Sequence, residues 1–195
     1  MPRLFTAIEM PADTALSLSM LRGGLPGARW IDPENYHITL RFFGDVDSHM
    51  AAEIANELAR MKRQPLQLRL DGLDAFGGKK PHSLHASVQK TQQLRNLYLE
   101  QERMAQRIGL KPEGRKFAPH VTLARTRSSK GHDVANYLSL RGSFSTMPFT
   151  VNRFVLFSSR DSTGGGPYIV EEEYPLLAKS SATGPYSRTD HATLL

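Results

Sequence analysis

Two stretches of the sequence repeat one pattern, a histidine followed two residues later by a threonine. The sequence reads HITL from His37 to Leu40 and HVTL from His120 to Leu123. An imidazole titrates near neutral pH, so it can give or take a proton under physiological conditions. A threonine hydroxyl can donate a hydrogen bond to a negatively charged oxygen. The repeated pair therefore predicts two half-sites of one cleft, in which two histidines divide the work of acid and base.

Both copies have the alternation of a β-strand, with β-branched and aromatic residues at regular spacing. Successive side chains of a strand face opposite sides, so His37 and Thr39 share one face while Ile38 shares the other with Leu40. Each strand is thus expected to turn an apolar face to the core and a His-x-Thr face away from it. A strand on a solvated sheet face would explain one such copy; two copies favour a functional site.

A phosphodiester is the substrate that suits two imidazoles and two hydroxyls. One neutral histidine can take a proton from water, and one protonated histidine can give a proton to the leaving oxygen. The hydroxyls and a nearby arginine can stabilise the charge that develops on the phosphoryl oxygens. A strained cyclic phosphate fits best, because its leaving group is an alkoxide that needs the acid. This chemistry requires neither a metal nor another cofactor.

Composition agrees with such a substrate without proving it. The chain has 195 residues, a net charge of +6 and a pI of about 9.7, which favours polyanionic ligands such as RNA or nucleotide phosphates. There is no cysteine, which excludes disulfides and thiolate metal sites and agrees with a reducing compartment. No stretch has the length of a signal-peptide core or a membrane span. We therefore expect a cytoplasmic protein with no membrane partner. We also expect it to act as a monomer.

The chain alternates between strand and helix signals from its start to about residue 177. Strands are expected over Arg3–Glu9, over the two histidine strands, and over Leu66–Leu70, Ser83–Gln89, Met147–Ser158 and Tyr168–Leu177. Helices are expected over Asp13–Arg22, Ser48–Met61, Thr91–Ile108 and Asp133–Leu140, with Asp13 and Thr91 as N-caps and Gly109 ending the third helix. Breaker-rich loops separate them at 76–81 and 159–167.

This order predicts an α+β fold with a mainly antiparallel sheet. The duplicated histidine strands further predict two lobes related by a pseudo-twofold axis, within one domain over residues 1–177. From Ala178 to Leu195 the sequence is rich in Ser, Thr, Gly and Ala without periodicity, which is typical of a disordered tail.

With its context, the histidine pattern resembles the two-histidine phosphoesterase superfamily. Within it, the match is to the RNA 2′,3′-cyclic phosphodiesterases, historically also called 2′-5′ RNA ligases. The stretches that carry the resemblance are Arg3–Ile8, Trp30–Leu40, Phe117–Arg125 and Gly166–Tyr168. The resemblance implies a bilobal fold whose histidine strands line a central cleft, and substrates that are RNA ends or nucleotide 2′,3′-cyclic phosphates.

The resemblance also implies roles for single residues. It assigns His37, Thr39, His120 and Thr122 to catalysis, with His120 as the base for water and His37 as the acid for the leaving oxygen. It makes Arg125 a phosphate contact and Phe42 a stacking partner for a base.

Strand alternation complicates the last two assignments. Phe42 and Arg125 each follow a histidine by five residues, so in an ideal strand they point away from the cleft. They reach it only if each strand bends or ends there, and the alternative for Phe42 is packing in the core. Arg41 lies four residues after His37, so in an ideal strand it shares the face of His37 and is an alternative phosphate contact.

Two other functions stay open at the level of sequence. A nucleotide- or RNA-binding module could keep the same cleft with little turnover, although binding alone does not require two titratable imidazoles. RNA ligation, the reverse reaction, would use the same residues as hydrolysis. A metal site is not expected at His82 and His85, because residues three apart in a strand face opposite sides.

Overall fold

A computed structural model of the chain describes residues 3–159 and 166–177. The expected tail, and most of the expected turn at 159–167, lie outside these residues. Within the described ranges, no helix combines the length and the apolar character that crossing a membrane requires.

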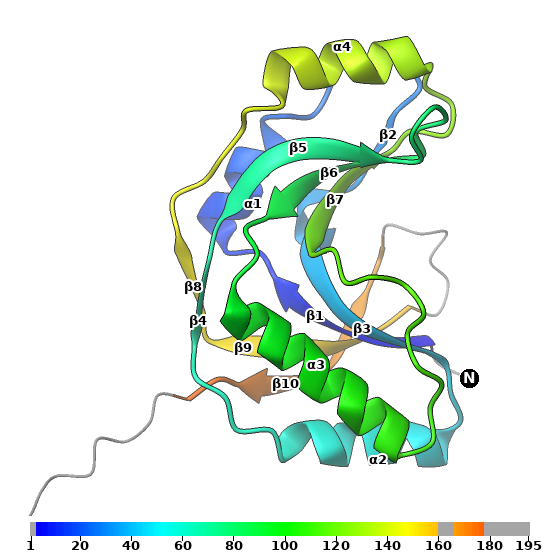
Figure 1. Cartoon of the computed structure of the whole chain (residues 1–195), viewed down its shortest axis with the longest axis vertical. Helices are drawn as coiled ribbons and strands as arrows, with labels where there is room; N and C mark the ends of the chain where they lie inside the picture. The colour runs from blue at the N-terminus through cyan, green and yellow to red at the C-terminus, as the bar shows by residue number, and fades with distance from the viewer. Residues whose placement is uncertain (1–2, 160–165, 178–195) are drawn as a thin grey trace, which may run out of the picture.

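The chain forms ten strands and four α-helices among the described residues (Figure 1). The strands are β1 (Arg3–Glu9), β2 (Arg29–Trp30), β3 (His37–Asp45), β4 (Leu66–Leu68), β5 (Leu70–Phe76), β6 (Ser83–Val88), β7 (His120–Arg125), β8 (Phe149–Val151), β9 (Arg153–Ser158) and β10 (Ile169–Pro175). The helices are α1 (Ala12–Ser19), α2 (Ser48–Ala59), α3 (Gln92–Arg107) and α4 (Gly131–Arg141), with a short 3-10 turn, η1, at Pro33–Asn35.

The large sheet has the order β10-β9-β1-β3-β7-β6-β5, with β2 beside β7. Every pairing between its strands is antiparallel, so the predicted α+β fold with an antiparallel sheet is confirmed. The sheet consists of two halves that meet between β3 and β7, where Ile38 with Val121 is the one described residue pair in register. The two histidine strands are therefore neighbours at the centre of the sheet, and they diverge on either side of this pair.

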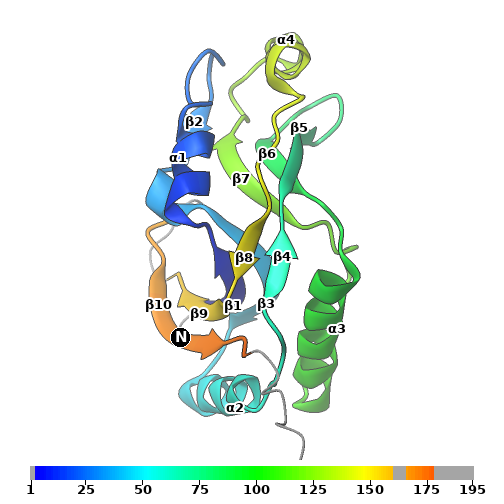
Figure 2. The ribbon, with the colours of Figure 1, turned by 90° about the vertical axis from the view of Figure 1, so that its left-hand side faces the viewer.

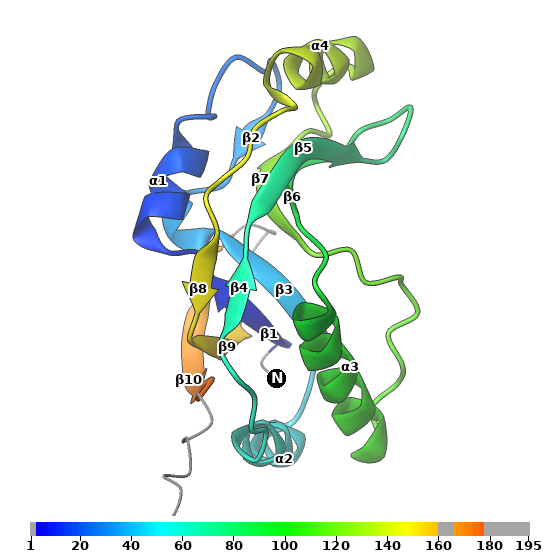
Figure 3. The same ribbon diagram turned by 60° about the vertical axis from the view of Figure 1, so that its left-hand side comes forward.

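The helices divide between the two ends of the molecule. In Figures 1 and 3, α2 and α3 lie at the end of the β1–β3 half, and α4 lies at the opposite end beside β5. The Tyr137 hydroxyl of α4 donates a hydrogen bond to the carbonyl of Leu21, which follows α1, and ties these two helices together. One continuous core runs under both halves and includes Ile38, Val121 and Leu123 of the histidine strands.

Helix α3 begins and ends where its sequence predicts. The Thr91 hydroxyl accepts a hydrogen bond from the backbone N–H of Leu94, which caps the first turn. Gly109 follows the helix with a φ of +93°, a left-handed conformation that glycine adopts without strain.

Three expected elements differ in the structure. The strand expected over 147–158 is broken at Asn152: β8 pairs with β4 in a separate ribbon, while β9 joins the large sheet (Figure 2). The strand expected over Leu66–Leu70 is divided as well: β4 ends at Leu68, and β5 begins at Leu70 and extends to Phe76, through a segment whose alternation is interrupted by Gly72. Helix α1 is shorter than expected, and Pro11 rather than Asp13 occupies its N-cap position.

Candidate functional site

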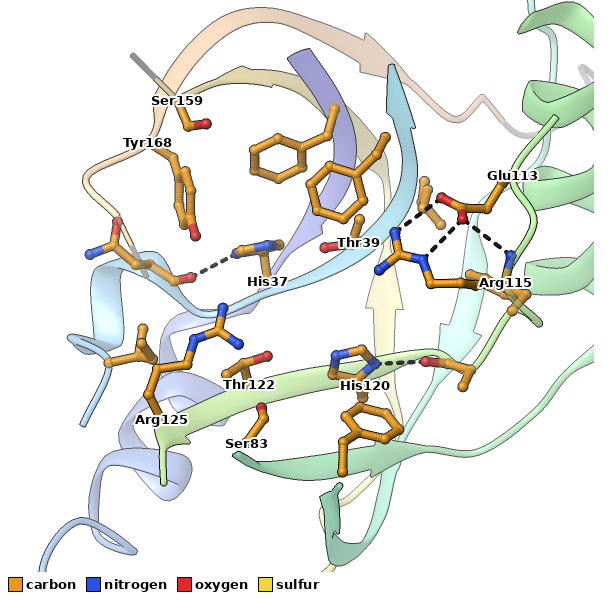
Figure 4. Close-up of a pocket in the computed structure, with 18 of the residues that line it drawn as sticks. His37, Thr39, Ser83, Glu113, Arg115, His120, Thr122, Arg125, Ser159 and Tyr168 are labelled. Atoms are coloured by element: carbon orange, nitrogen blue, oxygen red, sulfur yellow. Dashed lines mark hydrogen bonds and ion pairs between the residues drawn. The ribbon is translucent and has the colours of Figure 1, made fainter. Parts of the chain in front are cut away.

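A cavity of about 1040 Å³ lies where the two histidine strands diverge. His37 and Thr39 enter it from β3, and His120 and Thr122 enter it from β7 (Figure 4). The structure thus brings together the four side chains that the repeated pattern singled out. Both pairs lie on the face of their strand opposite the core, as the alternation predicted.

The two imidazoles are held in the same way. Nδ1 of His37 lies 2.8 Å from the carbonyl oxygen of Asn35, and Nδ1 of His120 lies 2.7 Å from that of Ala118. A carbonyl oxygen can only accept, so each Nδ1 carries a proton and donates it. Each Nε2 is then left to take or give a proton, as acid–base catalysis requires.

A β-bulge follows each threonine and determines which face of the strand the later residues occupy. Along β3, Ala7 pairs with Thr39 but Thr6 pairs with Arg41, so Leu40 is the extra residue. Along β7, the register jumps in the same way over Leu123. A bulge places two successive residues against one partner and reverses the alternation beyond it. Each residue five after a histidine therefore returns to the face of that histidine.

Arg125 and Phe42 accordingly line the cavity. Arg125 is half-buried, and among the described residues it has no carboxylate partner, so its charge is available to an anion. Burial, together with the nearby charges of Arg29 and Arg127, lowers its pKa. Phe42 leaves 40% of its surface exposed and contacts Phe5 with a centroid distance of 5.1 Å.

The same bulge turns Arg41 away from the cavity, which corrects the expectation that it rivals Arg125. Arg41 is 5% exposed and forms a buried ion pair with Glu102 of α3. Its guanidinium also donates to the backbone carbonyl of Lys111 at 2.6 Å. Strand alternation predicted the wrong face for Arg41, because the alternation of side chains ends at Leu40.

Burial shifts both histidines toward the neutral form. It lowers the pKa of His37 to about 4, with smaller contributions from the charges of His120 and Arg125. It lowers the pKa of His120 as well, again with a contribution from Arg125. Both imidazoles are therefore neutral at pH 7 and can accept a proton, and a bound anion would favour protonation of either.

Two further residues contact the histidines and were not predicted as site residues. Tyr168 meets the His37 ring edge-on at 5.0 Å. His85 of β6 lies 5.1 Å from the His120 ring and stacks on Phe76 at 4.1 Å. His85 is brought beside His120 because it pairs with Thr122 of β7. This pairing joins distant segments, so the sequence of one strand alone does not predict it.

His85 gives rise to a prediction about acid stability. It is 4% exposed, and burial lowers its pKa to about 4. An unfolded chain binds a proton at this site below about pH 6.5, whereas the folded chain does not until about pH 4. Folding stability contributed by this residue is therefore lost as pH falls through that window. We expect His85→Gln to flatten the fall by roughly 1 kcal/mol per pH unit.

The measurement is urea unfolding of both proteins at several pH values from about 7.5 to about 4.5, a range that spans the window. Comparing slopes rather than absolute stabilities removes any uniform effect of the substitution. Parallel slopes for the two proteins would contradict the assignment of a depressed pKa to His85.

Comparison with known proteins places this geometry in a family. The family model of the LigT-like phosphoesterases matches the chain twice, over residues 8–85 and 86–168, with one His-x-Thr pattern in each match. The RNA 2′,3′-cyclic phosphodiesterase of Aquifex aeolicus is 32% identical over 76% of this chain and 81% of its own length. The protein of the same name from Thermotoga maritima is 30% identical over 86% and 92%.

Solved structures share the fold. A protein of Thermus thermophilus superposes with a TM-score of 0.77 at 20% identity, over 91% of this chain and all of its own. The LigT protein of E. coli, solved in complex with 3′-AMP, superposes with a TM-score of 0.71 at 22% identity over the same shares. The duplicated histidine strands, their common cavity and the double match of the family model lead to one conclusion: the chain belongs to the LigT-like phosphoesterases of the two-histidine superfamily.

Proposed function

We propose that this protein hydrolyses 2′,3′-cyclic phosphodiesters of RNA ends or nucleotides to 2′-phosphomonoesters. The observation that carries the proposal is the matched pair of imidazoles, each fixed through Nδ1 and each entering one cavity. The names of the relatives support the same class of reaction. Hydrolysis needs one proton acceptor and one proton donor, and the cavity holds one candidate for each.

In the proposed step, a water oxygen forms a bond to phosphorus while the bond from phosphorus to the ribose 3′ oxygen breaks. His120 takes the proton from the water, and His37 gives a proton to the 3′ oxygen. The product carries a 2′-phosphate and a free 3′ hydroxyl. Exchange with solvent then returns both imidazoles to their starting states.

The order of protonation follows from the charge of the substrate. With a pKa of about 4, His37 is neutral at pH 7. A phosphodiester anion bound between the rings raises the pKa of a nearby imidazole, so the acid is charged with the substrate in place. The assignment of acid to His37 follows the family resemblance.

The remaining cavity residues bind and stabilise the anion. The Thr39 and Thr122 hydroxyls have no hydrogen-bond partner within the described residues, so they are free to donate to the non-bridging phosphoryl oxygens. Arg125 offsets the charge that accumulates on those oxygens in the transition state. Phe42 offers an exposed aromatic face on which a base can stack.

The test is incubation with adenosine 2′,3′-cyclic phosphate, with the products followed by phosphorus NMR. A 2′-phosphate product supports the proposal, whereas a 3′-phosphate would reverse the assignment of the leaving oxygen. Ligation of RNA ends through a 2′-5′ bond is the reverse of this chemistry, and the same site would serve it. We further propose that the protein acts as a monomer in the cytoplasm.

Activity is expected to survive EDTA. Among the residues that the structure describes, no three side chains of His, Cys, Asp or Glu gather closely enough to hold a metal ion. The two imidazoles and the Arg125 charge supply the roles that a metal would otherwise fill. We expect kcat/KM in excess EDTA to stay within about twofold of its value without chelator. Loss of turnover in EDTA that a divalent ion restores would contradict the mechanism.

A further inference from the structure

A second cavity of about 460 Å³ opens at the N-terminal end of α3, and we refer to it as the α3 cavity. Its walls come from the first two turns of α3 and from the loop that leads into β7. Tyr98, Lys116 and Phe117 line both this cavity and the catalytic one, so the two share a wall. Figure 4 shows the same loop, with Glu113 and Arg115, on the α3 side of the histidines.

The α3 cavity carries positive charge without compensation. Lys90, Arg95 and Lys116 line it and are exposed, and no acidic residue does. In the described part of the chain, none of these three forms an ion pair. Two other cations near α3 are paired, Arg107 with Glu57 and Arg63 with Glu100. Unpaired cations around a cavity favour an anionic ligand.

The shared wall is aromatic. The Tyr98 and Phe117 rings are stacked, with centroids 4.1 Å apart and an angle of 3° between their planes. Both are only half-buried, so part of their surface faces solvent. Aromatic side chains beside a basic groove are the combination that binds single-stranded nucleic acid, because every base can stack. The positive end of the α3 dipole adds to the attraction for phosphate.

We propose that the α3 cavity binds the nucleotides that precede the terminal cyclic phosphate of a single-stranded RNA. This inference rests on the proposed function. An RNA whose terminal phosphate lies between the histidines must continue out of the catalytic cavity, and the α3 cavity adjoins it at Tyr98, Lys116 and Phe117. Its cations would contact the backbone phosphates, and its aromatic residues would contact a base. The protein would therefore prefer oligonucleotide ends over mononucleotides.

The experiment compares two substrates, adenosine 2′,3′-cyclic phosphate and a short RNA that ends in the same cyclic phosphate. The double variant Lys90→Ala/Arg95→Ala removes two cations that line only the α3 cavity. We expect kcat/KM for the RNA to fall roughly tenfold at low salt, and its logarithmic salt slope to become shallower by about 1.4. The mononucleotide should change by less than about twofold, because it does not reach these residues.

The control is Lys62→Ala/Arg103→Ala, which removes the same charges from exposed positions outside both cavities. An equal loss on RNA in both double variants would show a general charge effect and overturn the inference. So would an equal loss on both substrates, or unchanged hydrolysis of RNA. If the unmodified protein hydrolysed neither substrate, the proposed function itself would be wrong.

Discussion

Replacing His37 or His120 by alanine is expected to lower kcat/KM by at least about 10²-fold, the low end for a positioned acid or base. Both imidazoles are fixed through Nδ1 and enter the same cavity, so neither can take over the position of the other. The measurement is steady-state hydrolysis of a nucleoside 2′,3′-cyclic phosphate. Nearly unchanged turnover in either single variant would contradict the two-histidine mechanism. If the unmodified protein and both variants bound the nucleotide without hydrolysing it, the protein would instead be a binding module.

The two variants should differ when the leaving group is changed. A substrate with a far better leaving group at the 3′ position no longer needs the acid, so it should rescue His37→Ala selectively. The unmodified protein should show a bell-shaped dependence of kcat/KM on pH, because the reacting complex needs one imidazole neutral and the other protonated. Rescue of His120→Ala alone would reverse the two roles.

Breaking the buried ion pair between Arg41 and Glu102 is expected to have the largest effect on stability. Arg41→Met removes the cation that faces the Glu102 carboxylate at a position that is only 8% exposed, where the Gln106 side chain and the Glu113 backbone N–H remain as its hydrogen-bond donors. Removing one partner of such a pair costs about 3–5 kcal/mol. Urea unfolding at pH 7 would measure the loss. A change below about 1 kcal/mol would contradict the placement of this pair in the core.

The double variant Arg41→Met/Glu102→Met separates structure from phosphate binding. Replacing both partners by apolar residues of similar size is often neutral, so it should restore most of the stability. If Arg41 only supports the fold, this double variant also keeps its kcat/KM for the cyclic phosphate. A stable double variant with kcat/KM lowered about tenfold or more would instead make Arg41 a phosphate contact.

Local patterns were enough to predict most of the elements and to single out the four residues that meet in the cavity. The alternation at His37 and His120 predicted both strands and the face that each histidine occupies, because side-chain direction in a strand depends on local geometry. The cap at Thr91 and the glycine at 109 predicted the ends of α3 for the same reason.

Features that depend on register were not predictable. Nothing in the HITLRFF segment marks Leu40 as the extra residue of a bulge, because a bulge is defined by the partner strand. Arg41 and Arg125 were therefore compared as phosphate contacts by assuming regular strand alternation. That alternation is interrupted at Leu40 and Leu123, before either arginine. His85 was missed in the same way, since its approach to His120 requires the pairing of β6 with β7.

The junction between the two halves of the sheet has a mechanical consequence. Ile38 and Val121, its one described pair in register, are immediate chain neighbours of His37 and His120. A rotation of one half against the other would have its pivot at this pair, and displacement grows with distance from a pivot. The imidazoles lie close to this pair, so the distance between them would change little, while the outer edge of the cavity would move by a larger amount. Widening the mouth for a bulky polymer would thus leave the geometry of proton transfer almost unaltered.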